Sequence, residues 1–117
     1  MQTTKQPSKR SQRLSELSEP RRALVRLCQA TNFGEIRGLQ VRNSEPVLKP
    51  SPVVVMDIKL DSGRGPRSEV GLPDFELARE VLILLDQLGQ IENGDIGRIE
   101  IRAAIPRRLV FQQKPVL

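Results

Sequence analysis

Two stretches of the chain repeat each other without a gap: Gly34-Glu35-Ile36-Arg37-Gly38-Leu39-Gln40-Val41-Arg42-Asn43-Ser44-Glu45-Pro46 and Gly94-Asp95-Ile96-Gly97-Arg98-Ile99-Glu100-Ile101-Arg102-Ala103-Ala104-Ile105-Pro106. Both begin with Gly, both end with Pro, and both keep the first Ile and the last Arg. Several other positions carry conservative exchanges, such as Leu39 for Ile99. Each copy follows an apolar stretch with helical spacing. The repeat therefore predicts an internal duplication of a helix-hairpin unit.

The apolar residues of each copy are spaced by three and then by two, whereas a regular strand keeps a spacing of two. In the first copy they are Ile36, Leu39 and Val41. A β-bulge at Arg37-Gly38, and at Gly97-Arg98 in the second copy, explains the step because it adds one residue to the strand. The alternative is a strand that starts only after the Gly.

Each copy then turns into a short return strand. The polar residues Asn43-Ser44-Glu45 favour a hairpin turn in the first copy, and Leu109-Val110-Phe111 closes the hairpin of the second. Pro46 and Pro106 lie at matching positions of the return strands. Because proline cannot donate a ladder hydrogen bond, we expect both return strands at sheet edges, which the prolines would protect.

A helix is predicted before each copy. Leu24, Leu27, Cys28 and Thr31 recur at helical spacing, with Ser18 as a plausible cap. The second helix is the longer one, and we expect Asp74 to cap it and Gly89 to end it. Its apolar stripe is Leu77, Ala78, Val81, Leu82, Leu84, Leu85 and Leu88. The two helices align, Leu24 with Val81, if Gly89-Gln90-Ile91 is an insertion.

The segment Val53-Val54-Val55-Met56-Asp57-Ile58-Lys59-Leu60 is the strongest strand signal in the chain. Its apolar and β-branched residues favour a strand, and Asp57 and Lys59 indicate that one face is solvated at its far end. We expect this strand near the centre of the sheet. Residues 61–73 are rich in Gly and Pro and predict a mobile loop.

Together these elements predict an α+β fold in two layers, an antiparallel sheet with two helices on one face, in the order α-β-β-β-α-β-β. A chain of 117 residues with 38% hydrophobic content supports one core. We expect residues 1–19 to form a disordered basic tail, residues 20–112 a single α+β domain, and residues 113–117 a C-terminal tail.

The formal charge of +5 is concentrated at the N-terminus, since residues 1–22 hold six basic and two acidic residues. A pI near 10.1 suggests an anionic partner, and here the suggestion applies to the tail. The candidate nucleic-acid contacts are the cations of the tail and of the last hairpin. They are Lys5, Lys9, Arg10, Arg13, Arg98, Arg102, Arg107 and Arg108.

The sequence carries little catalytic chemistry. It has no histidine, the usual general base and the commonest metal ligand, and we assign no catalytic, cofactor-binding or metal-binding residue. The single cysteine, Cys28, lies on an apolar helix stripe and is expected in the core. Glu35 and Asp95 could meet if the copies pair about a two-fold axis, although solvated turn residues are the simpler interpretation.

The longest apolar run, Val81 to Leu85, is far shorter than the roughly 20 residues of a membrane span, so we expect no membrane partner. With one cysteine and no signal-type apolar run, the expected location is the cytoplasm. The Ser-, Thr- and Arg-containing start leaves a transit peptide as the alternative.

Two resemblances bear on the fold. Leu27 to Pro46, with Asn-Phe-Gly-Glu-Ile, an alternating strand and a polar turn, resembles the short bacterial YezD-like proteins, which are single helix-hairpin units of unestablished function. The order αβββα from Pro20 to Leu88 is similar to that of double-stranded RNA-binding domains. Those domains carry lysines at the start of the second helix, where this sequence has the acids Asp74 and Glu76.

We therefore expect a small non-enzymatic binding or interaction protein of the uncharacterised bacterial type, which forms a homodimer through exposed sheet edges. The alternative is a nucleic-acid-associated protein that binds through its basic N-terminal tail. A third class, an enzyme that uses only Asp, Glu, Lys and Arg, is the least supported.

Overall fold

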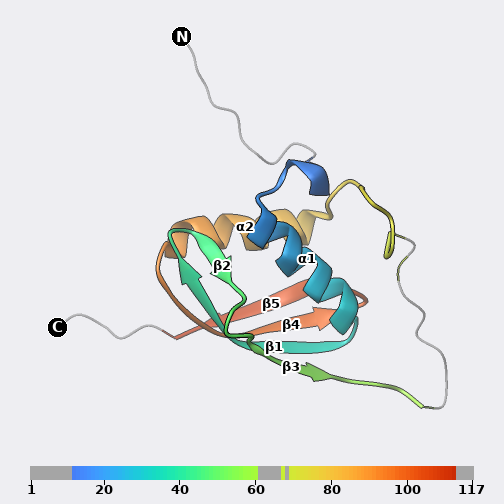
Figure 1. The fold of residues 1–117 in the computed structure, drawn as a ribbon. Coiled ribbons are helices and arrows are strands. Elements are labelled where there is room, and N and C mark those ends of the chain that lie inside the picture. Colours follow the sequence, from blue (N-terminus) through green and yellow to red (C-terminus); the bar gives the residue numbers. More distant parts are fainter. Residues whose placement is uncertain (1–11, 61–66, 68, 113–117) are drawn as a thin grey trace, which may run out of the picture.

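The computed structural model describes residues 12–60, 67 and 69–112, and it shows two helices packed on one face of an antiparallel sheet (Figure 1). This confirms the predicted α+β class and the order α-β-β-β-α-β-β. The elements are a 3₁₀ turn η1 (Leu14–Glu16), α1 (Glu19–Thr31), β1 (Gly34–Arg42), β2 (Glu45–Val47), β3 (Val53–Met56), α2 (Arg79–Ile91), β4 (Gly94–Arg102) and β5 (Ile105–Phe111). The predicted C-terminal tail, 113–117, lies outside the described residues.

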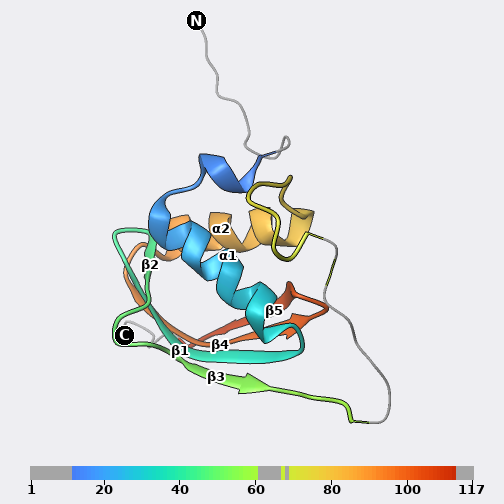
Figure 2. The same ribbon diagram turned by 45° about the vertical axis from the view of Figure 1, so that its right-hand side comes forward.

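The sheet has the strand order β2-β1-β4-β5. Strand β3 also pairs with β1, the strand that β2 pairs with. Strands β1 and β4 are therefore central, and Figure 2 shows both helices lying across them. The largest fully buried side chains are contributed by both helices and by these two strands. They are Leu24, Ile36, Leu39, Leu88, Ile96, Ile99, Val41, Thr31 and Cys28.

The pairing of β1 with β4 relates the two sequence copies by a pseudo-two-fold axis. Gly34 pairs with Ile101, and Val41 pairs with Gly94. Equivalent positions of the two copies lie 60 residues apart, so Gly34 is equivalent to Gly94 and Ile101 to Val41. Exchanging the copies thus turns the pair Gly34 and Ile101 into the pair Gly94 and Val41, and the register is the same in both directions. The axis passes between the strands beside Arg37 and Arg98, which face each other.

The helices obey the same offset, so the predicted insertion at Gly89-Gln90-Ile91 is wrong. Helices α1 and α2 both have 13 residues and begin 60 positions apart. Leu24 is therefore equivalent to Leu84, and both are buried. Val25 and Cys28 are likewise equivalent to Leu85 and Leu88, and all four are buried.

Each half of the molecule closes the helix end of the other half. The amide of Ser44 donates to the carbonyl of Glu92 at 2.8 Å, and the amide of Ala104 donates to the carbonyl of Asn32 at 2.8 Å. Asn32 and Glu92 are the C-cap residues of α1 and α2, and both have φ of 63°. These reciprocal bonds fix each hairpin against the opposite helix. A common origin of the two halves stays a prediction.

The predicted bulge is present in β4, whereas β1 keeps one register with β4 and shows only a local irregularity at Arg37-Gly38. In β4 the register with β5 shifts between Ile96 and Arg98, as predicted. In β1 the consecutive residues Arg37 and Gly38 are both exposed, and Gly38 has φ of 72°. Both strands start at the Gly that begins the copy, so the alternative of a later start is wrong.

The second helix begins and ends later than predicted. Its N-cap is Ala78 instead of Asp74, because the Asp74 carboxylate accepts hydrogen bonds from Arg13 and Ser15. Gly89 lies inside α2, which ends at Ile91. Leu88 is fully buried beside it, and such packing offsets the roughly 1 kcal/mol cost of an internal Gly.

The folded domain starts earlier than the predicted boundary at residue 20. Leu14 and Leu17, assigned to a disordered tail, are 3% and 6% exposed and belong to the core. The backbone holds this segment in place, since Leu14 donates to the carbonyl of Phe75 at 3.0 Å and Leu77 donates to that of Gln12 at 2.8 Å. Two isolated leucines in a polar stretch gave no periodic signal. The tail residues 1–11 lie outside the described residues.

The first prediction separates the two equivalent glycines. A Cβ on Gly34, which has φ of 149°, would lie 1.9 Å from the backbone oxygen of Val55, whereas a Cβ on Gly94 would meet the Phe111 ring at 3.1 Å. Gly34→Ala should lower the free energy of unfolding by about 2 to 4 kcal/mol, and the matched Gly94→Ala by about 1 kcal/mol or less. Urea titration measures both. Equal losses would contradict the close approach of β3 to β1.

The second prediction concerns the N-terminal segment. Leu14→Ala should lower the free energy of unfolding by about 2 to 4 kcal/mol, because it removes a buried side chain from the core. Leu72→Ala, at a side chain that is 45% exposed, is the matched control and should change stability by less than about 1 kcal/mol. Thermal or urea unfolding gives both values. A Leu14→Ala variant as stable as the control would show that this segment is not part of the core.

Candidate functional site

Strand β3 lies at an edge of the sheet, which contradicts the prediction that it is central. Its register partners are Gly34 to Arg37 of β1, and the other side of β1 is occupied by β4. The chain reaches this position because β2 and β3 both return antiparallel along the same side of β1. The strongest strand signal in the sequence thus belongs to an edge strand.

The free side of β3 can be identified from the hydrogen bonds on its paired side. The amide of Asp57 donates to the carbonyl of Phe33 at 2.7 Å, so Asp57 directs its backbone groups toward the β1 side. Backbone groups alternate in direction along an antiparallel strand. Val54 and Met56 therefore direct their amide and carbonyl groups away from β1.

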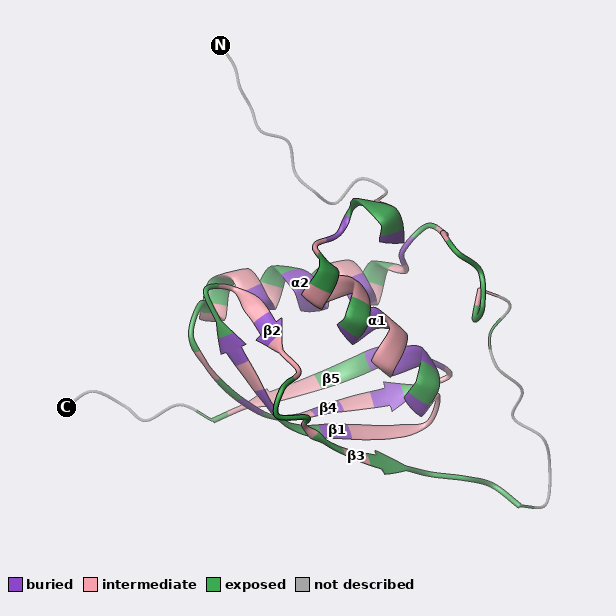
Figure 3. Cartoon of the chain, viewed as in Figure 1, coloured by how far each residue is buried: buried purple, intermediate pink, exposed green. Residues whose placement is uncertain are grey.

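The side chains along this edge are apolar and exposed. Val53, Met56, Ile58 and Leu60 are 60%, 51%, 68% and 93% exposed, and in Figure 3 this part of the chain is almost entirely coloured as exposed. Only Val54 is partly buried against the core. Past β3 the chain continues away from the sheet (Figure 1). We call residues 53–60 the β3 edge.

The opposite edge of the sheet is protected by its sequence. Strand β5 carries Pro106, which lacks an amide hydrogen, followed by Arg107 and Arg108. Arg107 also donates to Glu80 of α2 at 3.0 Å. Prolines and charges on an edge strand discourage pairing with another strand. Strand β3 has neither a proline nor a charge between Val53 and Met56.

The candidate nucleic-acid contacts divide into those of the N-terminal segment and those of the last hairpin. Lys5, Lys9 and Arg10 lie outside the described residues. Arg13 forms an ion pair with Asp74 at 2.8 Å.

The four arginines of the last hairpin are divided between partners. Arg98 pairs with Glu100 on its own strand at 3.2 Å, whereas Arg107 reaches Glu80. Arg108 is the register partner of Glu100, and Arg102 is exposed at the end of β4. Acidic side chains thus offset much of the charge that the sequence placed in one cluster.

Glu35 and Asp95, considered as a possible pair, do not face each other across β1 and β4. Glu35 faces Glu100, whereas Asp95 faces Gln40, because the antiparallel register places Glu35 and Asp95 toward opposite ends of the ladder. Each of the facing carboxylates has an arginine on its own strand, Arg37 for Glu35 and Arg98 for Glu100. These ion pairs neutralise the two acids, and the shallow cavity of about 360 Å³ beside Glu35 and Glu100 is of mixed charge.

Cys28 is a core residue, as predicted. It is 2% exposed, and burial raises the pKa of its thiol to about 12, so the thiol stays protonated at neutral pH. Within residues 12–60, 67 and 69–112, no three Cys, Asp or Glu side chains are grouped as metal ligands. No helix in this part of the chain has the length and apolar character needed to cross a membrane.

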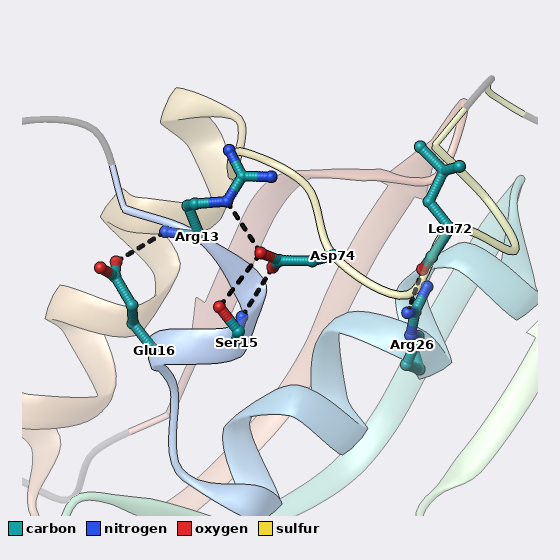
Figure 4. Close-up of polar contacts among 6 residues, drawn as sticks. All are labelled: Arg13, Ser15, Glu16, Arg26, Leu72 and Asp74. Atoms are coloured by element: carbon teal, nitrogen blue, oxygen red, sulfur yellow. Dashed lines mark hydrogen bonds and ion pairs between the residues drawn. The ribbon is translucent and has the colours of Figure 1, made fainter.

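A cluster of polar contacts fastens the N-terminal segment to the residues before α2 (Figure 4). Asp74 accepts from the Arg13 guanidinium at 2.8 Å and from the amide and hydroxyl of Ser15 at 2.9 and 3.1 Å. The bond from Arg13, and next that from the Ser15 amide, lower the pKa of the Asp74 carboxyl to about 2. Nearby, Arg26 donates to the carbonyl of Leu72.

Comparisons with protein-family models, with curated proteins and with solved structures found no match to this chain. The resemblance of each half to the YezD-like proteins therefore stays a prediction. Of the eight exposed large apolar side chains in the described part of the chain, five lie on the β3 edge.

The third prediction concerns acid stability. Because the pKa of Asp74 is lowered in the folded state, its carboxylate stabilises the fold above about pH 4, and this contribution is lost as the pH falls toward 2. Asp74→Asn should lower the melting temperature at neutral pH, and the difference from the unsubstituted protein should shrink below pH 4. Asp95→Asn, whose Arg42 partner is 3.8 Å away at a more exposed site, is the matched control. A pH-independent difference for Asp74→Asn would contradict the ion pair.

Proposed function

We propose that this chain is a small non-enzymatic interaction protein that binds a protein partner through the β3 edge. The observation that carries the proposal is an apolar, exposed strand that pairs, among the described residues, with β1 alone, at the side of the sheet opposite the protected β5 edge. Such a strand has free donors and acceptors that an added strand can pair with, and apolar side chains that favour burial.

The proposed mode of binding is strand addition. The partner would supply an extended segment antiparallel or parallel to β3, with main-chain hydrogen bonds to Val54, Met56 and Ile58. Main-chain bonds give affinity in this mode, and the alternate side chains give selectivity. The lack of histidine and the buried, protonated Cys28 support the non-enzymatic part of the proposal.

Nucleic-acid association through Lys5, Lys9 and Arg10 is the second proposal. The supporting observation is the sequence itself, in which residues 1–15 carry four cations and no acid. Because the fourth of them, Arg13, is engaged by Asp74, fewer cations are available than the sequence indicated. Binding of this kind would be weak, independent of sequence and steeply dependent on salt.

The fourth prediction tests these proposals by capture from native lysate. Immobilised protein is compared with Ile58→Glu, which places a charge on the β3 edge, and with Ile83→Glu as the matched control. Ile83 is 50% exposed on α2, far along the chain from the edge. We expect nuclease-resistant capture by the unsubstituted protein and by Ile83→Glu, and a loss of at least about tenfold with Ile58→Glu.

Two outcomes would contradict the first proposal. Capture that survives Ile58→Glu unchanged would show that the β3 edge is not the contact. Capture that disappears on nuclease treatment in every variant would favour the nucleic-acid proposal. The captured proteins are identified by mass. The endogenous chain is lighter than the tagged bait, so capture of a second copy can be told from capture of another protein.

A further inference from the structure

The end of the β3 edge is complementary to itself. Its sequence is Met56-Asp57-Ile58-Lys59-Leu60, with apolar side chains at alternate positions and one acid and one base between them. When two copies run antiparallel with Ile58 opposite Ile58, Asp57 of each copy faces Lys59 of the other. Met56 of each copy then faces Leu60 of the other. Opposite charges in register stabilise strand pairs.

The backbone is oriented for this register. Met56 directs its backbone groups to the free side, as the bond from Asp57 to Phe33 requires, and Ile58 does the same when pairing extends β3 beyond Met56. Ile58 opposite Ile58 is therefore a hydrogen-bonded pair, and Asp57 opposite Lys59 is a non-hydrogen-bonded pair. Side chains approach more closely in non-hydrogen-bonded pairs, with Cα atoms about 4.5 Å apart, so the ion pairs fall where contact is best.

Other antiparallel registers are less favourable. A shift that places Met56 opposite Met56 puts Asp57 against Val55 and Lys59 against Val53, and both ion pairs are lost. If the two-fold axis instead passes between two residues, each residue whose backbone groups point to the free side faces one whose backbone groups point away from it. The ladder hydrogen bonds then cannot form. A register with Leu60 opposite Leu60 keeps Lys59 opposite an acid, Asp61, but places Asp57 against Gly63. The register centred on Ile58 is the one in which both Asp57 and Lys59 face an opposite charge.

We propose that the partner at the β3 edge is a second copy of this chain, paired antiparallel about a two-fold axis through Ile58. This inference rests on the proposed function, because it names the partner of the same surface. The pairing joins two sheets edge to edge and covers Met56, Ile58 and Leu60, which are among the most exposed apolar side chains of the described residues. A short strand pair buries little surface, so the dimer is expected at the weak end of specific interfaces.

The fifth prediction is a charge-swap experiment by sedimentation velocity on the full chain, over a concentration series that reaches high micromolar. Asp57→Lys places Lys against Lys59, and Lys59→Asp places Asp57 against Asp, so each variant alone should dimerise at least about tenfold more weakly. Mixing the two variants restores both opposite-charge pairs, and so does the double variant D57K/K59D. Both samples should dimerise like the unsubstituted protein.

Lys49→Asp is the matched control, since it makes the same change at an exposed lysine outside the paired segment and should leave dimerisation unchanged. Circular dichroism and melting temperature confirm that each variant is folded. A monomer at every concentration would overturn the inference, and so would a dimer that neither single swap weakens. Neither result removes the proposed function, which is tested separately by capture from lysate with Ile58→Glu and with nuclease.

Discussion

The structure depends on the pairing of β1 with β4 about the pseudo-two-fold axis. These two strands bury Ile36, Leu39, Ile96 and Ile99 completely, and each helix packs over the sheet that they centre. Burying four such side chains contributes on the order of 6 to 12 kcal/mol before the entropy of ordering is subtracted. Each hairpin also completes the helix end of the other half through a backbone hydrogen bond.

The asymmetry of the molecule arises in the return strands. Ile36 pairs with Val54 and its equivalent Ile96 pairs with Phe111. Val54 lies eight positions after Pro46, whereas Phe111 lies five positions after Pro106. The return segment of the first half therefore has three more residues, and it is interrupted between β2 and β3. The second half returns as one strand protected by proline and arginine, and the first half leaves an unprotected apolar edge.

The sequence was sufficient for the fold class because the repeat and the helical periodicity are local patterns. It was insufficient where the outcome depends on contacts between distant residues. Leu14 and Leu17 are core only because residues 12–14 pair with 75–77, and Asp74 is not a helix cap because Arg13 and Ser15 occupy its carboxylate. Neither contact has a signature in spacing.

The candidate site was the least predictable part of the molecule. A run of β-branched residues indicates a strand but not its position, and Val53 to Met56 is apolar on both faces whether it is central or at an edge. Pro50 and Pro52 just before it, and Asp57 and Lys59 just after it, were the available signals of an edge. For the cations of the last hairpin, spacing gave no sign of their acidic neighbours, which are Glu80 for Arg107 and Glu100 for Arg98.

Amide hydrogen exchange by NMR tests the central claim, that β3 is a half-paired strand whose free side binds. At low protein concentration the amides of Val55 and Asp57 should exchange slowly and those of Met56 and Ile58 fast, with the amide of central Ile99 protected throughout as the internal reference. At high concentration the amides of Met56, Ile58 and Leu60 should become protected as the free side is occupied. Protection at Met56 and Ile58 that is already complete in the dilute protein, or an absence of alternation between Val55 and Ile58, would contradict the account.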